Sequence, residues 1–430
     1  MPEKILFILY NLLQWLLLVC SLPFIIPVIL TSEKRRATVL QRLGFQSFQA
    51  VKQNAMNTIW IHALSVGEVN SAVPLVKKIR STYPKHIIIM TASTQTGYAT
   101  ALNALEQDTN AILYFPYDIL WAVLKMIKII NPIIFILVES DIWPNILMEL
   151  NRRHVPTVLV NGRLSPDSFR GYRKASIFLK IIFRCFSLAC VQSHEEAERF
   201  ITIGMPDKKI QIVGNIKFDR LVHVISDQKL SQLRHSLGIS DTTQIIIAGS
   251  THPGEEDLII QAFKQIIQIV PDCKLIIAPR DPKRAKEIAC QYQKDQFGIE
   301  CFSTQTNKDY SVLIIDKMGI LNDLYAISTL AFVGGSLVSC GGHNPLEPAS
   351  FGKPILFGPD MSDFPQISDM LLTEKAAIRV TSIEDLYENI KHLLLHKTMQ
   401  KNMGQNAFSV FNKNQGAVDR TIQHISRLLN

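Results

Sequence analysis

The sequence predicts an α/β protein with two doubly wound domains, each built on a parallel sheet, behind an apolar N-terminal segment. Short apolar runs alternate with helical stretches from Ile59 onward, which is typical of a parallel sheet covered by helices on both faces. The alternation stops between residues 217 and 238 and then starts again. The 430 residues exceed what one hydrophobic core usually holds. We therefore expect two domains with a cleft between them, at residues 37–222 and 223–430.

The first domain is predicted from short apolar runs that read as buried strands, separated by stretches with helical spacing. The predicted strands are 59–64, 86–91, 111–115, 133–138, 157–160, 188–191 and 210–213. The predicted helices are 69–80, 97–106, 120–130, 143–153, 169–186 and 195–203. This repetition indicates successive βαβ units.

The second domain repeats the same pattern. Its predicted strands are 244–248, 274–278, 312–315, 329–333 and a strand that starts at Ile355. A helix ends at Ile269, a second covers 283–296, a third follows Gly319, and the tail 399–430 is helical. In both domains we expect ligands at the carboxyl ends of the strands.

Residues 1–36 are predicted to form a membrane anchor with a basic flank. The uncharged run Ile5–Leu30 is long enough to cross a hydrocarbon core of ~30 Å, but internal prolines and amides leave open whether it spans the membrane or lies in it. Lys34, Arg35 and Arg36 follow directly. They predict that the domains lie on the cytoplasmic side of the membrane and favour anionic lipids as partners.

The composition excludes several classes of protein. The formal net charge is +8, from 45 Lys and Arg against 37 Asp and Glu, but no basic run is interleaved with aromatic residues. We therefore expect no nucleic-acid partner. The seven cysteines are scattered without metal-ligand spacing and indicate a reducing compartment. No Asp-x-Asp motif that would hold a divalent ion against a phosphate is present, so no metal and no cofactor is expected.

A glycine-rich stretch, residues 332–359, has the layout of a nucleotide site. An apolar strand ends at Gly334, and the helix start Asn344-Pro345-Leu346-Glu347 offers an N-cap, a proline at the first position and a capping-box glutamate. Free amides of the loop and the helix end would attract phosphate. The alternative is that the glycines only relieve crowding. The pattern matches neither a dinucleotide fingerprint nor a P-loop.

Three charged residues follow strands and are candidates for chemistry. Glu68 begins a helix, so it is a catalytic candidate or merely a cap; Glu139 directly ends an apolar strand, where a charge needs a partner or a function. Asp141 reads as the N-cap of the next helix. Lys217 lies where the two halves join and is either solvated or faces an anionic leaving group. His62 reads as a core histidine.

Six motifs in order resemble the 3-deoxy-D-manno-octulosonic acid (Kdo) transferases over nearly the whole chain. They are His62-Ala-Leu-Ser-Val-Gly-Glu68, Glu139-Ser-Asp-Ile-Trp-Pro-Asn145, Asn161-Gly-Arg-Leu-Ser165, Gly214-Asn-Ile-Lys-Phe-Asp219, Ser250-Thr-His-Pro-Gly-Glu-Glu256 and the stretch from Gly334 to Glu347. The resemblance implies the GT-B fold, with two Rossmann-like domains. It also implies transfer of Kdo from CMP-Kdo to the lipid A precursor, lipid IVA, in lipopolysaccharide biosynthesis.

The resemblance further implies roles for residues. Glu68 would be the general base, and Glu139 and Lys217 would stabilise the transition state. The CMP-binding positions would be Pro279, Arg280, Met318, Gly319, Ile320, Asn344, Pro345, Leu346 and Glu347. Two positions depart from the family pattern, because Ile320 stands where a Glu is expected and Asp281 where a His is usual. Transfer would be inverting and independent of metal.

Two other functions fit the same sequence. One is a GT-B transferase that moves a UDP-sugar to a membrane lipid carrier. The other is a membrane-tethered nucleotide-binding module without catalysis, in which Glu68 and Glu139 would be replaceable. Donor choice between CMP and UDP separates the first alternative from Kdo transfer, since cytosine and uracil present opposite hydrogen-bonding groups.

Overall fold

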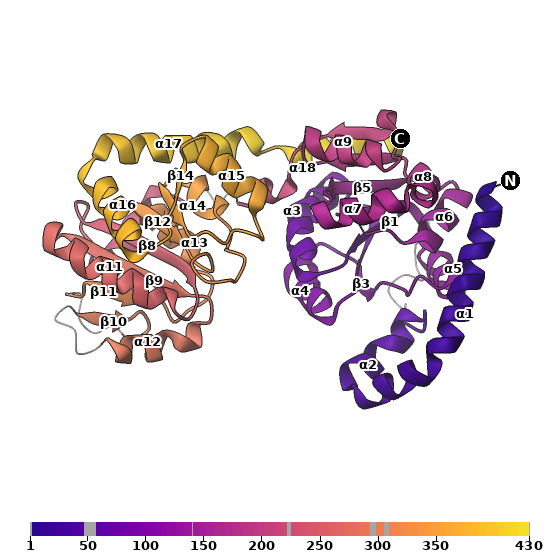
Figure 1. Ribbon diagram of the computed structural model, residues 1–430, viewed down its shortest axis with the longest axis horizontal. Coiled ribbons are helices and arrows are strands. Elements are labelled where there is room, and N and C mark those ends of the chain that lie inside the picture. Colours follow the sequence, from indigo (N-terminus) through magenta and orange to yellow (C-terminus); the bar gives the residue numbers. More distant parts are fainter. Residues whose placement is uncertain are drawn as a thin grey trace. The chain divides into compact units, whose positions relative to one another are not determined.

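The computed structural model describes residues 2–46, 57–139, 141–221, 225–292, 298–304 and 309–429 (Figure 1). The chain forms two compact units. Unit 1 consists of Met1–Arg220 and Gln415–Asn430, and unit 2 consists of Leu221–Asn414. The strand and helix alternation predicted from the sequence is confirmed in both units.

Unit 1 is built on a seven-stranded sheet in the order β3-β2-β1-β4-β5-β6-β7, and all of its pairings are parallel. Its strands are β1 Thr58–Ala63, β2 Ile87–Ala92, β3 Ala111–Tyr114, β4 Pro132–Val138, β5 Thr157–Gly162, β6 Leu188–Val191 and β7 Ile210–Ile212. The strand order reverses direction between β1 and β4, which is where a doubly wound fold places its ligand.

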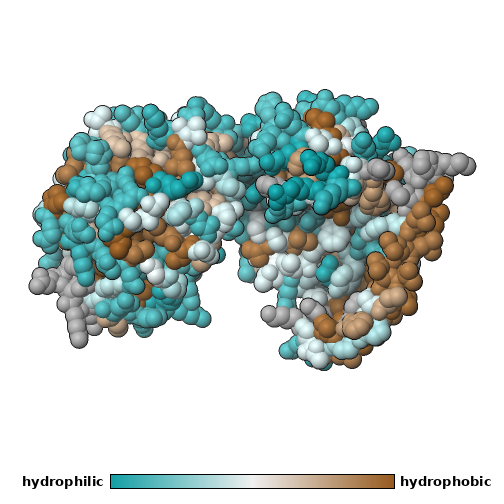
Figure 2. All heavy atoms as spheres, in the orientation of Figure 1, coloured by the Kyte–Doolittle hydropathy of each residue, from teal (hydrophilic) through white to brown (hydrophobic). Residues whose placement is uncertain are grey.

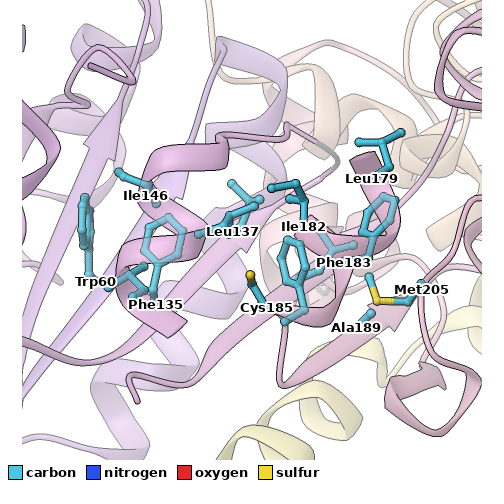
Figure 3. Packing of buried hydrophobic residues seen from close by; sticks show 14 of the residues in the cluster. Trp60, Phe135, Leu137, Ile146, Leu179, Ile182, Phe183, Cys185, Ala189 and Met205 are labelled. Carbon is cyan, nitrogen blue, oxygen red and sulfur yellow. The ribbon is translucent and has the colours of Figure 1, made fainter. Parts of the chain in front are cut away.

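Helices cover both faces of this sheet. They are α3 Val66–Thr82, α4 Gln95–Leu105, α5 Leu120–Ile130, α6 Pro144–Arg152, α7 Pro166–Lys174, α8 Ser176–Arg184 and α9 His194–Thr202. One core joins Trp60, Phe135 and Ile146 to Phe183 of α8 (Figure 3). The other joins Ile59 and Ile61 to α3 and α4. Neighbouring residues of β1 thus point into opposite cores, which explains why the strands read as unbroken apolar runs.

Unit 2 has a second seven-stranded parallel sheet in the order β10-β11-β9-β8-β12-β13-β14. Its strands are β8 Gln244–Thr251, β9 Cys273–Pro279, β10 Ile299–Cys301, β11 Val312–Ile314, β12 Leu330–Val333, β13 Ile355–Phe357 and β14 Ala377–Arg379. Its helices are α10 Asp227–Ser236, α11 Glu255–Ile269, α12 Ala285–Gln291, α13 Leu321–Ile327, α14 Leu346–Ser350, α15 Pro365–Thr373, α16 Ile383–Leu395 and α17 Lys397–Asn414. Here the order reverses between β8 and β12.

Several elements differ from the prediction. The single helix expected at 169–186 is two helices, α7 and α8, that meet at Ala175. The expected connection 217–238 contains α10, and the short edge strands β10 and β14 were not predicted. Three-residue edge strands carry too little alternation to stand out from loops. Residues 293–297, where the helix at 283–296 was expected to end, lie outside the described residues.

The helical tail is divided between the two units, which corrects the expected extent of the second domain. Gly416, at φ +82°, separates α17 from α18 Ala417–Leu429, and α18 packs in the core of unit 1. Asp219 caps α18, accepting hydrogen bonds from Gly416 N at 2.7 Å and Val418 N at 2.6 Å. The sequence shows only that both helices are amphipathic and not which core each one joins.

The N-terminal segment forms one helix, α1 Pro2–Thr31, followed by α2 Glu33–Arg42. α1 is long and apolar enough to cross a membrane. Its apolar side chains form a brown strip along the edge of unit 1 (Figure 2). Pro23 and Pro27 lie within the helix without ending it.

Candidate active site

The predicted catalytic residues of unit 1 meet at the carboxyl ends of neighbouring strands. β1 leads into the turn that begins α3 with Glu68, and β4, which pairs with β1, ends directly before Glu139. Lys217 lies in a 3₁₀ helix, Ile216–Leu221, just after β7. Although Lys217 is distant along the chain, its Nζ lies 3.8 Å from Glu139 Oε1.

Glu68 is a buried carboxyl group, 8 % exposed. Its Oε2 accepts a hydrogen bond from Leu64 N at 2.5 Å, and Ser65 Oγ donates to Oε1 at 3.4 Å. Burial and the nearby negative charge of Asp141 raise its pKa from 4.5 to about 8, and Glu139 adds to the effect. A carboxylate with this pKa accepts a proton near neutral pH, as a general base must. The hydrogen bond from Leu64 N to the Glu68 carboxylate also fits a capping role.

Glu139 is held in a backbone conformation that is rare for residues other than glycine, with φ +61°. Its amide donates to Val160 O at 2.8 Å, and its half-buried carboxylate faces Lys217. Asn161, also at positive φ, accepts a hydrogen bond from Ile216 N at 3.2 Å and so positions the turn that carries Lys217. The charge that ends β4 therefore has a partner.

Asp141 lies at the site and does not cap α6, so the role predicted for it from the sequence is wrong. It was expected to cap α6, but the α6 amides of Asn145 and Ile146 donate instead to Asp118, at 3.0 and 3.1 Å. Among the described residues Asp141 Oδ2 is buried without a hydrogen-bond partner. Burial and the charge of Glu139 raise the pKa of Asp141 to about 6. The cap comes from a residue 27 positions away in sequence, so the local pattern alone suggested the wrong carboxylate.

His62 is a core residue, as the sequence analysis expected. It is fully buried and stacks on Phe115 with ring centroids 3.6 Å apart, and its Nδ1 lies 3.0 Å from Thr91 O. Burial lowers its pKa to about 3, so the ring stays neutral at physiological pH. Among the described residues, the titratable groups of the site therefore include Glu68, Glu139, Asp141 and Lys217.

Replacing Asp141 with Asn is expected to shift the pH dependence of activity. The substitution removes a negative charge that raises the pKa of Glu68. The pKa of Glu68 falls, and the acid limb of the kcat/KM profile moves to lower pH. Steady-state rates from pH 5 to 9 measure the limb. A limb that keeps its position would show that the titration of Glu68 does not control the rate.

In unit 2, the amides of the glycine loop are already occupied, which corrects the expectation that they bind phosphate. The buried Glu255 accepts hydrogen bonds from Gly335 N at 2.7 Å, Ser336 N at 3.0 Å and Leu337 N at 2.9 Å. A Cβ at Gly334 would come within 2.5 Å of Ser250 O. At this loop the glycines allow close packing of the backbone, which is the alternative to a phosphate site given above.

Cationic and imidazole side chains gather beside this loop. Arg280 follows β9, His252 follows β8, and His343 closes the loop after β12, so all three lie at the carboxyl edge of neighbouring strands. The Nε2 atoms of His252 and His343 are 2.9 Å apart, and their rings stack. Burial, Arg280 and His252 lower the pKa of His343 to about 4. Both histidines lie within motifs of the sequence, but no local pattern gave them a role.

The remaining predicted nucleotide positions lie at the starts of α13 and α14. Asn344 Oδ1 accepts a hydrogen bond from Leu346 N at 3.2 Å, and α14 begins at Leu346, so Pro345 precedes the helix instead of opening it. Burial raises the pKa of Tyr325 in α13 well above its ordinary value, and the negative charge of Glu347 adds to the effect. Met318 is exposed, Gly319 has φ +88°, and Pro279 ends β9.

The two departures from the family pattern have structural roles. Ile320 is half-buried and packs against the core beneath α13. Asp281 accepts a hydrogen bond from Lys283 N at 3.1 Å and caps the turn after β9. Both side chains are therefore engaged by the protein itself.

The fold is the GT-B class, with two doubly wound parallel sheets. A crystal structure of a UDP-N-acetylglucosamine 2-epimerase is similar, with a TM-score of 0.59 and 16 % identity over 86 % of this chain and 96 % of that one. The sequence relatives are more specific. The 3-deoxy-D-manno-octulosonic acid transferase of Haemophilus influenzae is 34 % identical over 95 % of this chain and 96 % of its own length.

A second relative and a family model agree. The transferase of the same name from Rickettsia felis is 32 % identical over 87 % of this chain and 80 % of its own length. Residues 37–220 match the family model described as 3-deoxy-D-manno-octulosonic-acid transferase (kdotransferase). The chain belongs to the Kdo transferase family, which confirms the resemblance seen in its motifs.

Proposed function

We propose that this Kdo transferase moves Kdo from CMP-Kdo to the lipid A precursor, lipid IVA, and releases CMP. The observation that carries the proposal is the buried Glu68 with a pKa of about 8, beside the Glu139 and Lys217 pair, in a chain of this family. Glu68 takes the proton of the acceptor hydroxyl as the oxygen attacks the anomeric carbon of Kdo. One base acting in a direct displacement inverts that carbon.

Positive charge is needed where CMP leaves. The carbon–oxygen bond between Kdo and the phosphate breaks, and its electron pair goes to the phosphate oxygen of CMP. Lys217 supplies a cation that stabilises this developing charge, and Glu139 holds Lys217 in position. The proposed chemical step thus uses the side chains of Glu68, Glu139 and Lys217 and calls for no metal ion or cofactor.

The donor nucleotide is assigned to unit 2. Arg280 carries a positive charge at the carboxyl edge of the sheet, and the His252 and His343 pair offers further polar contacts to a phosphate. Glu347 and Asn344 at the start of α14 offer acceptors for ribose hydroxyls. The backbone at Met318, Gly319 and Ile320 is expected to contact the base, since Ile320 brings no polar side chain.

The acceptor is a membrane lipid, and the apolar α1 supports work at the inner membrane. We assign the catalytic units to the cytoplasmic side, because Lys34, Arg35 and Arg36 follow α1 directly in sequence and the cytoplasmic leaflet attracts basic segments. Anionic inner-membrane lipids are the expected partners of this basic flank.

Calorimetric titration with CMP and with UDP tests the donor assignment. A Kdo transferase that uses CMP-Kdo is expected to bind CMP at least tenfold more tightly than UDP, because the two bases present opposite donors and acceptors. Tighter binding of UDP would favour the alternative, transfer of a UDP-sugar to a lipid carrier.

Glu347→Ala is expected to weaken CMP binding about tenfold or more and to cost roughly 1 kcal/mol or less of stability. The substitution removes a carboxylate that would accept hydrogen bonds from the ligand, whereas α14 spans only Leu346–Ser350 and contributes little to folding. Calorimetry and thermal unfolding measure the two effects. Glu374→Ala, an exposed carboxylate of the same unit, is the matched control. Equal CMP affinity in the Glu347→Ala variant and the parent would remove Glu347 from the site.

A further inference from the structure

The N-terminal helix contacts the rest of unit 1 through a cluster of polar side chains in the first half of its apolar sequence. Asn11 Nδ2 donates to Asn145 Oδ1 at 2.9 Å, and Asn145 Nδ2 donates to Gln14 Oε1 at 3.2 Å. Gln14 Nε2 donates to Asp118 O at 2.7 Å, and Tyr10 OH donates to Asp118 Oδ2 at 3.2 Å. We call these five residues the polar junction.

The α1 residues of the polar junction lie on one stripe of the helix. Tyr10, Asn11, Gln14, Leu18 and Ser21 recur at helical spacing and are shielded relative to their neighbours. The opposite face is apolar and open, with Leu9 55 %, Leu16 62 % and Leu30 61 % exposed. A helix with a narrow polar contact stripe and a broad apolar face outward is suited to rest on a hydrophobic surface.

Both ends of the N-terminal segment are attached to the same short stretch of unit 1. Near its start α1 is bonded to Asp118, and at the end of α2 Arg42 Nε donates to Phe115 O at 3.0 Å while Tyr117 N donates to Arg42 O at 3.0 Å. Gln46 pairs with the backbone of Tyr114. The chain therefore leaves residues 114–118 along α1 and returns to them along α2.

This geometry is incompatible with a transmembrane span. For Phe7–Phe24 to cross the hydrocarbon core, Asn11 and Gln14 would lie roughly 6 and 10 Å inside it, at a rise of about 1.5 Å per residue. Asp118 and Asn145 would have to enter with them, at a large cost for buried polar groups. If only residues 15–31 crossed the membrane, α2 would lie on the side of the membrane opposite Asp118. Arg42 at the end of α2 donates instead to Phe115 O, close to Asp118 in sequence.

The neighbouring surface fits a lipid headgroup layer. Leu40 and Phe45 are 61 % and 62 % exposed. The ring of Trp121 in α5 meets the Phe45 ring edge to face, with ring centroids 6.3 Å apart. Lys125 Nζ lies 3.5 Å from the centre of the Phe45 ring. Exposed aromatic rings with adjacent lysines are typical of groups at the membrane–water boundary.

We propose that α1 lies in the plane of an anionic phospholipid surface, fixed to unit 1 by the polar junction, and does not cross the bilayer. The occupant of the apolar face is the acyl boundary of the lipid layer, and the basic residues that follow α1 in sequence, Lys34, Arg35 and Arg36, favour anionic headgroups. This inference does not depend on the identity of the sugar donor or acceptor.

Spin labels at positions 9, 16 and 30 of the full chain, with exposed Cys20, Cys290 and Cys340 replaced by Ser, test the orientation. In phosphatidylglycerol-containing vesicles, power saturation should give one shallow depth, about 5–10 Å, at all three positions. A depth that passes through a maximum along the helix would overturn the proposal. So would a stable dimer that buries the labels and no longer binds vesicles.

The polar junction is tested with Asn11→Leu combined with Gln14→Leu. If the helix is docked, Asn145 loses its partners and Tm falls by about 4–8 °C, while vesicle binding is retained. The matched control, Leu16→Asn on the open face, should keep Tm and lose about tenfold or more in vesicle affinity. A spanning helix predicts unchanged Tm and firmer insertion for the double variant, and that result would contradict the docked arrangement.

Discussion

The Glu68→Gln variant is expected to transfer Kdo ~10²–10⁴-fold more slowly than the parent, with CMP affinity unchanged. Glutamine keeps the size of the side chain and an oxygen that accepts from Leu64 N, but it removes the basic group. The expected loss is therefore in turnover. Single-turnover rates, CMP calorimetry and thermal unfolding of the same preparation measure the three quantities.

Glu68 makes the stability of the parent protein depend on pH, and the sign of this dependence follows from its raised pKa. The folded pKa of Glu68, about 8, lies above its ordinary value of 4.5, so the folded state binds more protons than the unfolded state between these values. The free energy of unfolding therefore falls as pH rises from about 4.5 to 8. Glutamine removes this contribution, and the variant should lose less stability than the parent across that window.

Glu196→Gln is the matched control for the capping function of Glu68. Glu196 also occupies the first turn of a helix in unit 1 and accepts a hydrogen bond from a leucine amide, Leu164 N, at 2.7 Å. It is fully buried and paired with Arg199 at 3.2 Å. Its replacement should lower Tm and leave turnover per folded molecule near the parental value. If Glu68→Gln behaves in the same way, Glu68 is a cap and the base is Glu139.

Lys217→Met is expected to lower kcat/KM by ~10²–10³-fold, the usual effect of removing one group that stabilises developing negative charge. Methionine keeps the length of the side chain and removes the cation that faces Glu139 across 3.8 Å. Because the two charges are 3.8 Å apart and both side chains remain partly open to solvent, this ion pair contributes little to stability, and Tm should change by only a few degrees.

Two further variants show whether the loss is specific to the site. Lys208→Met removes an exposed lysine of the same unit and should leave kcat/KM unchanged. Lys217→Arg keeps the charge in a different shape and should restore part of the activity. Parental activity in Lys217→Met would exclude Lys217 from transition-state stabilisation.

The sequence predicted the sheets well because apolar runs and helical spacing are local signals. Glu139 illustrates the limit for the site. Its position at the end of β4 was visible in the sequence, whereas its partner Lys217 is brought near by Asn161, which positions the turn after β7. The pairing of Glu139 with Lys217 therefore depends on the order of β4, β5 and β7 in the sheet.

The main errors in predicting the two sites from the sequence come from carboxylates that bond to backbone amides far away in the chain. Asp118 caps α6 and Glu255 occupies the glycine-loop amides, although neither is near its partners in sequence. Local rules therefore gave the cap to Asp141 and left the loop amides free for phosphate. The family resemblance could not correct this, because motifs record which residues are present and not what they contact.

The central claim, transfer of Kdo from CMP-Kdo to the lipid A precursor, is tested most directly by mass spectrometry of the product. Purified full-length protein is incubated with CMP-Kdo and lipid IVA, with Glu68→Gln as the inactive comparison. The account predicts a lipid heavier by one or more Kdo residues, together with free CMP. A lipid that stays unchanged with CMP-Kdo and gains mass only with a UDP-sugar would contradict it.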